Sequence, residues 1–160
     1  MQLKISTDYA IRMTLYLAML GAAATAVDIS KAMGIPRSYI ASVAKPLCDV
    51  GILCATRGVN GGFALGMPAE AITLKMIVES TEGTTRINRC LEEDHYCSRN
   101  GAETCPVRRF YSWVQEGVDE AFGRMTIAML LQDPPPEHPV HRTVERWYAE
   151  HHEQNRNLDR

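Results

Sequence analysis

The chain has 160 residues, of which 46% are hydrophobic and 22% are charged, and its formal net charge is −2. This composition can build one domain with an appendage, and the absence of any run of about 18 apolar residues excludes a membrane-spanning helix. The N-terminal sequence lacks the apolar run and cleavage site of a signal peptide, so we expect a cytoplasmic protein. Residues 1–66 hold six Lys or Arg against three Asp or Glu, which makes this part basic and compatible with a nucleic-acid surface.

The first predicted helix covers residues 6–20. Ser6 or Thr7 is expected to cap it, and Gly21 ends it. Its apolar residues recur at steps of three or four, so one face should be buried. That expected face consists of Ile5, Tyr9, Met13, Tyr16, Leu17 and Leu20.

A helix-turn-helix is predicted next. Thr25 and Asp28 form a start that resembles a capping box, and the sequence Gly-Ile-Pro at 34–36 makes a tight turn. A second helix follows and stops at Gly51, with Pro46 inside it. In a helix-turn-helix the second helix enters the major groove of DNA.

Residues 52–67 are predicted to form a β-hairpin. Two short apolar runs flank a glycine-rich segment, in which Asn60 and Gly61 are typical of a two-residue turn. A hairpin directly after a helix-turn-helix is a wing. A further short helix, capped by Thr73, ends at Gly83, and we therefore assign residues 1–83 to a winged-helix domain.

The C-terminal half is expected to contain a loop, a long helix and a tail. Residues 84–105 lack periodicity and hold three cysteines. Residues 106–132 are predicted to form one amphipathic helix, too long for this small domain to cover, so we expect it to pack against a second copy. Lying across its own domain is the alternative. Residues 133–160 are a Pro-rich linker followed by an accessory helix. The apolar stripe of the long helix consists of Val107, Phe110, Val114, Val118, Phe122, Met125 and Met129.

Three of the five cysteines, Cys90, Cys97 and Cys105, follow the spacing C-x6-C-x7-C. In a reducing compartment such a group indicates metal ligands or redox groups. Three thiolates can hold an iron–sulfur cluster and leave one iron to a weaker ligand, which suits a sensor. A zinc site or a thiol switch without a cluster is the alternative. Cys48 and Cys54 are expected to be small buried apolar residues.

Together these motifs resemble the Rrf-type family of small bacterial winged-helix regulators. The matching segments are STDYAIRMTLYLA, DISKAMGIPRSYI, TRGVNGGFAL and ITLKMIVESTEG, followed by three cysteines before a long helix. The wing pattern R-G-x-x-G-G-x-x-L is the most specific of them. The resemblance implies a mainly α-helical, dimeric, DNA-binding transcriptional regulator, expected to be a repressor and not an enzyme. Cysteine-bearing members hold an iron–sulfur cluster and respond to nitric oxide, redox or iron status.

The resemblance is strongest to the NsrR-like members, and it implies a fourth cluster ligand. Those members use an aspartate at the place of Asp8, donated by the other subunit, and His95 is the alternative. IscR-like members use a histidine soon after the third cysteine, whereas Cys105 is followed here by Pro-Val-Arg-Arg. An aspartate ligand favours a [4Fe–4S] over a [2Fe–2S] cluster. The cysteine gaps are longer than the five residues commoner in the family.

The residues expected to contact double-stranded DNA lie in the recognition helix and the wing. They are Arg37, Ser38, Tyr39, Ser42, Lys45, Arg57, Asn60, Gly61 and Gly62. Arg37 can bind guanine through two hydrogen bonds or hold a phosphate. Gly61 and Gly62 would let the DNA backbone come close. A homodimer would read two half-sites roughly 34 Å apart. A winged helix that binds a partner protein is the alternative to the DNA-binding function.

Overall fold

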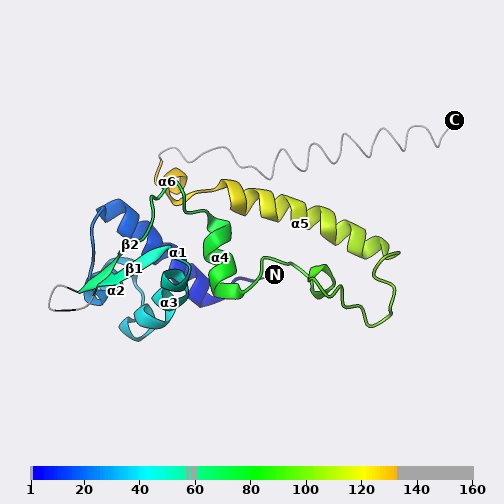
Figure 1. The fold of residues 1–160 in the computed structure, drawn as a ribbon, viewed down its shortest axis with the longest axis horizontal. Coiled ribbons are helices and arrows are strands. Elements are labelled where there is room, and N and C mark those ends of the chain that lie inside the picture. The colour runs from blue at the N-terminus through cyan, green and yellow to red at the C-terminus, as the bar shows by residue number, and fades with distance from the viewer. Residues whose placement is uncertain (1, 57, 59–60, 133–160) are drawn as a thin grey trace.

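The computed structural model describes residues 2–56, 58 and 61–132 and confirms a mainly α-helical winged helix with a long helix behind it (Figure 1). The predicted tail at 133–160 and the predicted DNA contacts Arg57 and Asn60 lie outside the described residues. No described helix is long and apolar enough to cross a membrane. The elements are α1 (Ile5–Leu20), α2 (Ala26–Met33), α3 (Arg37–Asp49), β1 (Leu53–Thr56), β2 (Gly62–Leu65), α4 (Leu74–Glu82), the 3-10 helix η1 (Arg89–Leu91), α5 (Pro106–Arg124) and α6 (Ile127–Leu130).

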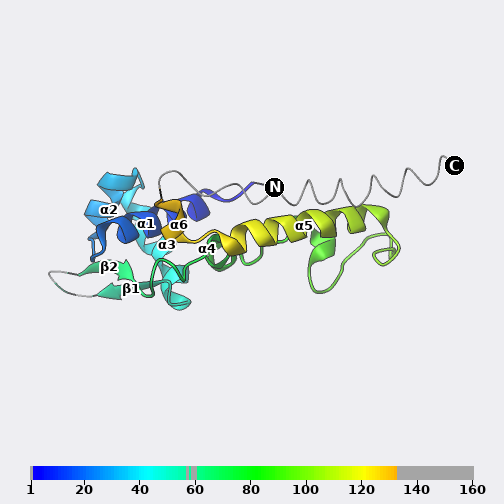
Figure 2. The ribbon, with the colours of Figure 1, turned by 90° about the horizontal axis from the view of Figure 1, so that it is seen from above.

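One hydrophobic core joins the winged-helix elements. Helix α1 packs against α2, α3, α4 and α6, and α4 in turn packs against α3 and α5. Met13 and Leu17 of α1 and Ile40 and Leu47 of α3 are fully buried in this core, and burying each such side chain stabilises the fold by about 1.5–3 kcal/mol. Figures 1 and 2 show α5 extending from this core, with the wing and the cysteine loop at opposite ends of the molecule.

The start of α1 differs from the prediction. The helix begins at Ile5, and its N-cap Lys4 makes no side-chain cap hydrogen bond. Thr7 is instead fully buried and donates its hydroxyl to Glu82 of α4, whose carboxylate also accepts the Lys4 backbone N–H at 2.8 Å. Because Thr7 is held by α4, the buried face of α1 is rotated from the expected one, and Ile5 and Leu20 are exposed. That face consists of Thr7, Ala10, Met13, Thr14 and Leu17.

The helix-turn-helix forms as local sequence signals predict. The Thr25 side chain accepts the Asp28 N–H while Asp28 accepts the Thr25 N–H, which completes the capping box. Gly34 ends α2 with φ of 64°, a conformation that glycine adopts without steric cost. Helix α3 continues through Pro46 and ends at Asp49, two residues before the predicted stop.

The wing consists of the antiparallel strands β1 and β2. Thr56 pairs with Gly62, so five residues separate the described strand ends, rather than the two of the predicted Asn60-Gly61 turn. The β2 strand is also joined to the segment before α2, because Ala24 and Phe63 exchange two backbone hydrogen bonds of 2.9 Å. A Cβ at Gly62 would lie 2.4 Å from the Ala24 carbonyl oxygen. Glycine at this position therefore lets the wing dock on the helix-turn-helix.

The predicted helix over 106–132 is divided in two. Helix α5 ends at Arg124 after 19 residues, and Met125 takes an extended conformation. Thr126 then caps the short helix α6. The break occurs because the chain pairs with the segment before α4: the Met125 carbonyl accepts the Leu74 N–H and Ile127 donates its N–H to the Ile72 carbonyl, both at 2.9 Å.

Candidate DNA-binding surface and cysteine loop

Helix α3 presents the predicted DNA-contacting residues on its solvent face. Its apolar residues at 40, 43, 44 and 47 are buried in the core, so the intervening positions must face outward. The exposed residues include the five predicted contacts on this helix: Arg37, Ser38, Tyr39, Ser42 and Lys45. The Arg37 side chain makes no ion pair or hydrogen bond among the described residues, whereas the Lys45 ammonium pairs with the Asp49 carboxylate at 2.7 Å. Exposed ion pairs contribute little, so a phosphate can compete for Lys45.

Two residues of α1, Tyr9 and Arg12, hold the start of the recognition helix. The Tyr9 ring meets the Tyr39 ring edge-on, with centroids 5.8 Å apart. The Arg12 guanidinium lies over Tyr9 at 5.9 Å and donates to the Met33 carbonyl at the end of α2. These contacts were not predicted, because helical periodicity places Tyr9 only on a buried face. They fix the N-terminal turn of α3, where base contacts are made in this class of motif.

The three loop cysteines occupy different local structures. Cys90 lies in η1, Cys97 in the irregular part of the loop, and Cys105 at the N-cap of α5. Cys90 is fixed beside α5 because its carbonyl accepts a hydrogen bond from Arg108 Nε at 3.1 Å. All five cysteines are free thiols. Among the described residues, no three or more His, Cys, Asp or Glu side chains are gathered closely enough to hold a metal.

The thiol of Cys97 lies in a bend that favours its ionised form. The backbone N–H groups of Gly101 and Arg99, with a smaller contribution from Asn100, lower the pKa of the Cys97 thiol below its usual value. Asn100 adopts a φ of 52° and donates its N–H to the Cys97 carbonyl at 3.0 Å, which closes the bend. Since a thiolate is the form that binds metal or reacts, the surroundings of Cys97 favour either chemistry.

The two predicted fourth ligands lie apart from any assembled site. Asp8 is in the first turn of α1 and forms an ion pair with Arg12 of its own chain at 2.6 Å. His95 is exposed on the cysteine loop with a φ of 47°. Within one described chain no three of these side chains gather, although His95 and Cys97 line the same pocket. Asp8 as a ligand from the partner subunit stays a prediction. The soft donor set suits iron or zinc, but assembling it requires the loop to rearrange or a second subunit to contribute.

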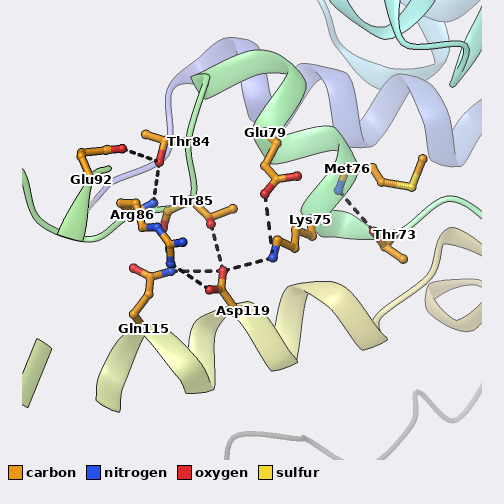
Figure 3. Close-up of polar contacts among 10 residues, drawn as sticks. All are labelled: Thr73, Lys75, Met76, Glu79, Thr84, Thr85, Arg86, Glu92, Gln115 and Asp119. Carbon is orange, nitrogen blue, oxygen red and sulfur yellow. Dashed lines mark hydrogen bonds and ion pairs between the residues drawn. The ribbon is translucent and has the colours of Figure 1, made fainter. Parts of the chain in front are cut away.

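Two residues of α5 that the sequence did not single out, Gln115 and Asp119, bind the first residues of the cysteine loop (Figure 3). A Gln and an Asp on a long helix are most often solvated, and no local signal sets them apart. Cys54, predicted to be buried, is instead exposed, because it lies on the outer face of β1.

A winged helix with an exposed recognition helix defines a DNA-binding protein of the helix-turn-helix class. The chain belongs to the Rrf2 family, described as iron-dependent transcriptional regulators, whose model matches residues 3–133. Among solved structures it is similar to CymR, the global cysteine regulator of B. subtilis, at 21% identity and a TM-score of 0.64, over 81% of this chain and 95% of that chain. It is also similar to T. potens IscR, at 17% identity and a TM-score of 0.64, over 83% of this chain and 88% of that chain. A transcriptional regulator from Listeria innocua is similar at 22% identity and a TM-score of 0.67, over 85% of this chain and 90% of that chain.

Proposed function

We propose that this protein is a cytoplasmic, homodimeric repressor whose DNA affinity is controlled by a [4Fe–4S] cluster. The ligands would be Cys90, Cys97 and Cys105, with Asp8 of the partner subunit. The observation that carries the proposal is the thiol-rich loop between α4 and α5, in which backbone N–H groups lower the pKa of Cys97. When bound, the cluster would supply an iron open to nitric oxide or oxidants. The family description as iron-dependent regulators supports this function.

Three functional segments follow from this proposal. Residues 1–83 would bind DNA, residues 84–105 would hold the cluster, and residues 106–132 would join the two subunits. The dimer is supported by the apolar stripe of α5, because Val107 and Phe110 are each 52% exposed within one chain. An amphipathic helix that its own domain leaves uncovered is stabilised by a second copy.

A regulator without a cluster is the second candidate. It is favoured by the separation of the described cysteines, which gather no metal site. The lowered pKa of Cys97 would then serve zinc binding or oxidation of the thiolate, with a second loop cysteine as its partner.

The first experiment is anaerobic purification with measurement of the absorption spectrum, iron, zinc and sulfide per chain. We expect a brown protein with stoichiometric sulfide. Cys97→Ser should lose the iron, whereas Cys54→Ser, which removes an exposed thiol outside the loop, should retain it. A colourless protein without iron or sulfide after anaerobic reconstitution would contradict the cluster, and bound zinc would support the second candidate.

A further inference from the structure

Gln115 and Asp119, which we call the polar hub, connect three parts of the chain on one face of α5 (Figure 3). The Asp119 carboxylate accepts hydrogen bonds from the Thr85 hydroxyl at 2.9 Å and from Arg86 at 3.1 Å. Gln115 accepts the Ile87 N–H at 2.8 Å, and its amide group donates to the Thr85 carbonyl and to Asp119, each at 3.2 Å. The entry to the cysteine loop is therefore bound to α5 by the polar hub.

The polar hub also reaches the DNA-binding half. The Lys75 Nζ of α4 lies 3.6 Å from Asp119 Oδ1. It also lies 3.9 Å from Oε1 of Glu79 on its own helix. Helix α4 packs against both α1 and the recognition helix α3, so a shift of α4 moves the recognition surface. A single carboxylate, Asp119, is thus shared between the cysteine loop and the winged helix.

Burial makes these contacts interdependent. Gln115 and Thr85 are only 3% and 7% exposed, although both are polar. Buried polar groups need partners, and removing one leaves the others unsatisfied. If residues 84–87 leave α5, Gln115 loses a donor and an acceptor at once. The contacts of the cysteine loop and of α4 on α5 should therefore form and break together.

We propose that the polar hub is the positioning element through which the state of the cysteine loop changes the placement of the winged helix. The part concerning DNA control rests on the function proposed above. The cooperative attachment of loop and α4 does not, because it follows from contacts among the chain's own residues. The two parts can therefore be tested separately.

The test uses Asp119→Asn, which keeps the side-chain shape and removes the charge that binds Arg86 and Lys75. Glu116→Gln is the matched control, because Glu116 is an exposed acid on the same helix whose side chain makes no ion pair or hydrogen bond among the described residues. The DNA probe is a duplex selected by the wild-type protein from a random pool. Its affinity is measured with cluster-loaded and with cluster-free protein, and the ratio of the two dissociation constants reports the coupling.

We expect Asp119→Asn to bring this ratio toward 1, whereas Glu116→Gln keeps the wild-type ratio. A purely structural role would change both dissociation constants equally and leave the ratio intact, which would refute the regulatory role. Amide hydrogen exchange of the cluster-free proteins is the second measurement. We expect Asp119→Asn to accelerate exchange by about 2- to 10-fold in residues 84–92 and in α4 alike.

The two measurements separate the failure of each proposal. If the wild-type affinity does not depend on the cluster, the proposed function is wrong, and hydrogen exchange alone decides the cooperative attachment. Faster exchange in both segments, with none in Glu116→Gln, would support it. Unchanged exchange, or acceleration in only one of the two segments, would overturn the proposal that the polar hub couples the attachment of the cysteine loop and of α4 to α5.

Discussion

Replacing Gly62 by alanine distinguishes two explanations for why glycine occupies this position in the wing. The sequence predicts that Gly62 lets DNA come close, whereas the structure packs its backbone on Ala24. A Cβ at 2.4 Å from the Ala24 carbonyl oxygen requires a displacement of at least about 1 Å to reach ordinary van der Waals contact. That displacement strains the two 2.9 Å hydrogen bonds between Ala24 and Phe63. We therefore expect the substitution to destabilise the fold even without DNA.

The expected loss of unfolding free energy in Gly62→Ala is about 2–4 kcal/mol. Overpacking costs about 1–3 kcal/mol, and each backbone hydrogen bond contributes about 0.5–1.5 kcal/mol. Urea denaturation of wild type and variant, followed by circular dichroism, measures the difference. Gly123→Ala is the control: it lies within α5, its Cβ would meet nothing closer than 4.0 Å, and it should stabilise the helix by up to about 1 kcal/mol.

The result that would refute this reasoning is a Gly62→Ala variant with wild-type stability and weakened DNA binding. The position would then serve close approach of DNA, as the sequence suggested, and the contact with Ala24 would relax at little cost. Reduced stability with DNA affinity unchanged at a temperature where the variant is folded would favour the packing explanation.

Three further predictions concern the recognition helix, the loop and the start of α1. Arg37→Ala should lower the preference for the selected duplex over a scrambled one by about 10-fold, whereas Lys45→Ala should weaken both equally; an unchanged preference for Arg37→Ala excludes base reading. In a variant that retains Cys97 as its single cysteine, the alkylation rate should reach half its maximum below pH 9.0, the ordinary thiol value; a midpoint at or above 9.0 contradicts the role of the bend. Burial raises the pKa of Glu82, but hydrogen bonds from Thr7 and Lys4 outweigh it and lower the pKa below 4.5. The stability that Glu82 contributes is therefore present above pH 4.5 and lost as the pH falls through the folded-state value, and Glu82→Gln should cost about 1–3 kcal/mol at pH 7. Equal stabilities of wild type and Glu82→Gln at pH 7, or an unchanged difference at low pH, would contradict this account.

Features set by neighbouring residues could be predicted from the sequence. The capping box at Thr25 and Asp28, the helix end at Gly34, and the Thr73 cap of α4 all depend on side chains within three or four positions. The outward face of α3 was also predictable, because the spacing of its apolar residues leaves Arg37 and its neighbours in solvent.

Features set by distant residues could not be predicted. The start of α1 depends on a carboxylate 75 positions away in sequence, at Glu82. The end of α5 depends on backbone pairing with the segment before α4, which no periodicity in residues 106–132 records. For the same reason Gln115 and Asp119 were missed, since their partners lie some 30 residues earlier. The ligand set of the cysteine loop stays a prediction.

The backbone pairing of Ala24 with Phe63 has a consequence for how a signal can act. It joins the wing to the helix-turn-helix of the same chain, so in the proposed regulator the two would move as one unit and the base preference within a half-site would not depend on the signal. In the proposed dimer, only the separation and tilt of the two DNA-binding units would remain adjustable. Helix α5 has 19 residues and is about 28 Å long. A rotation of this helix by about 5° about one end would therefore move its other end by about 2.5 Å. The signal would therefore change the preferred spacing between half-sites, while the base sequence preferred within each half-site stays the same.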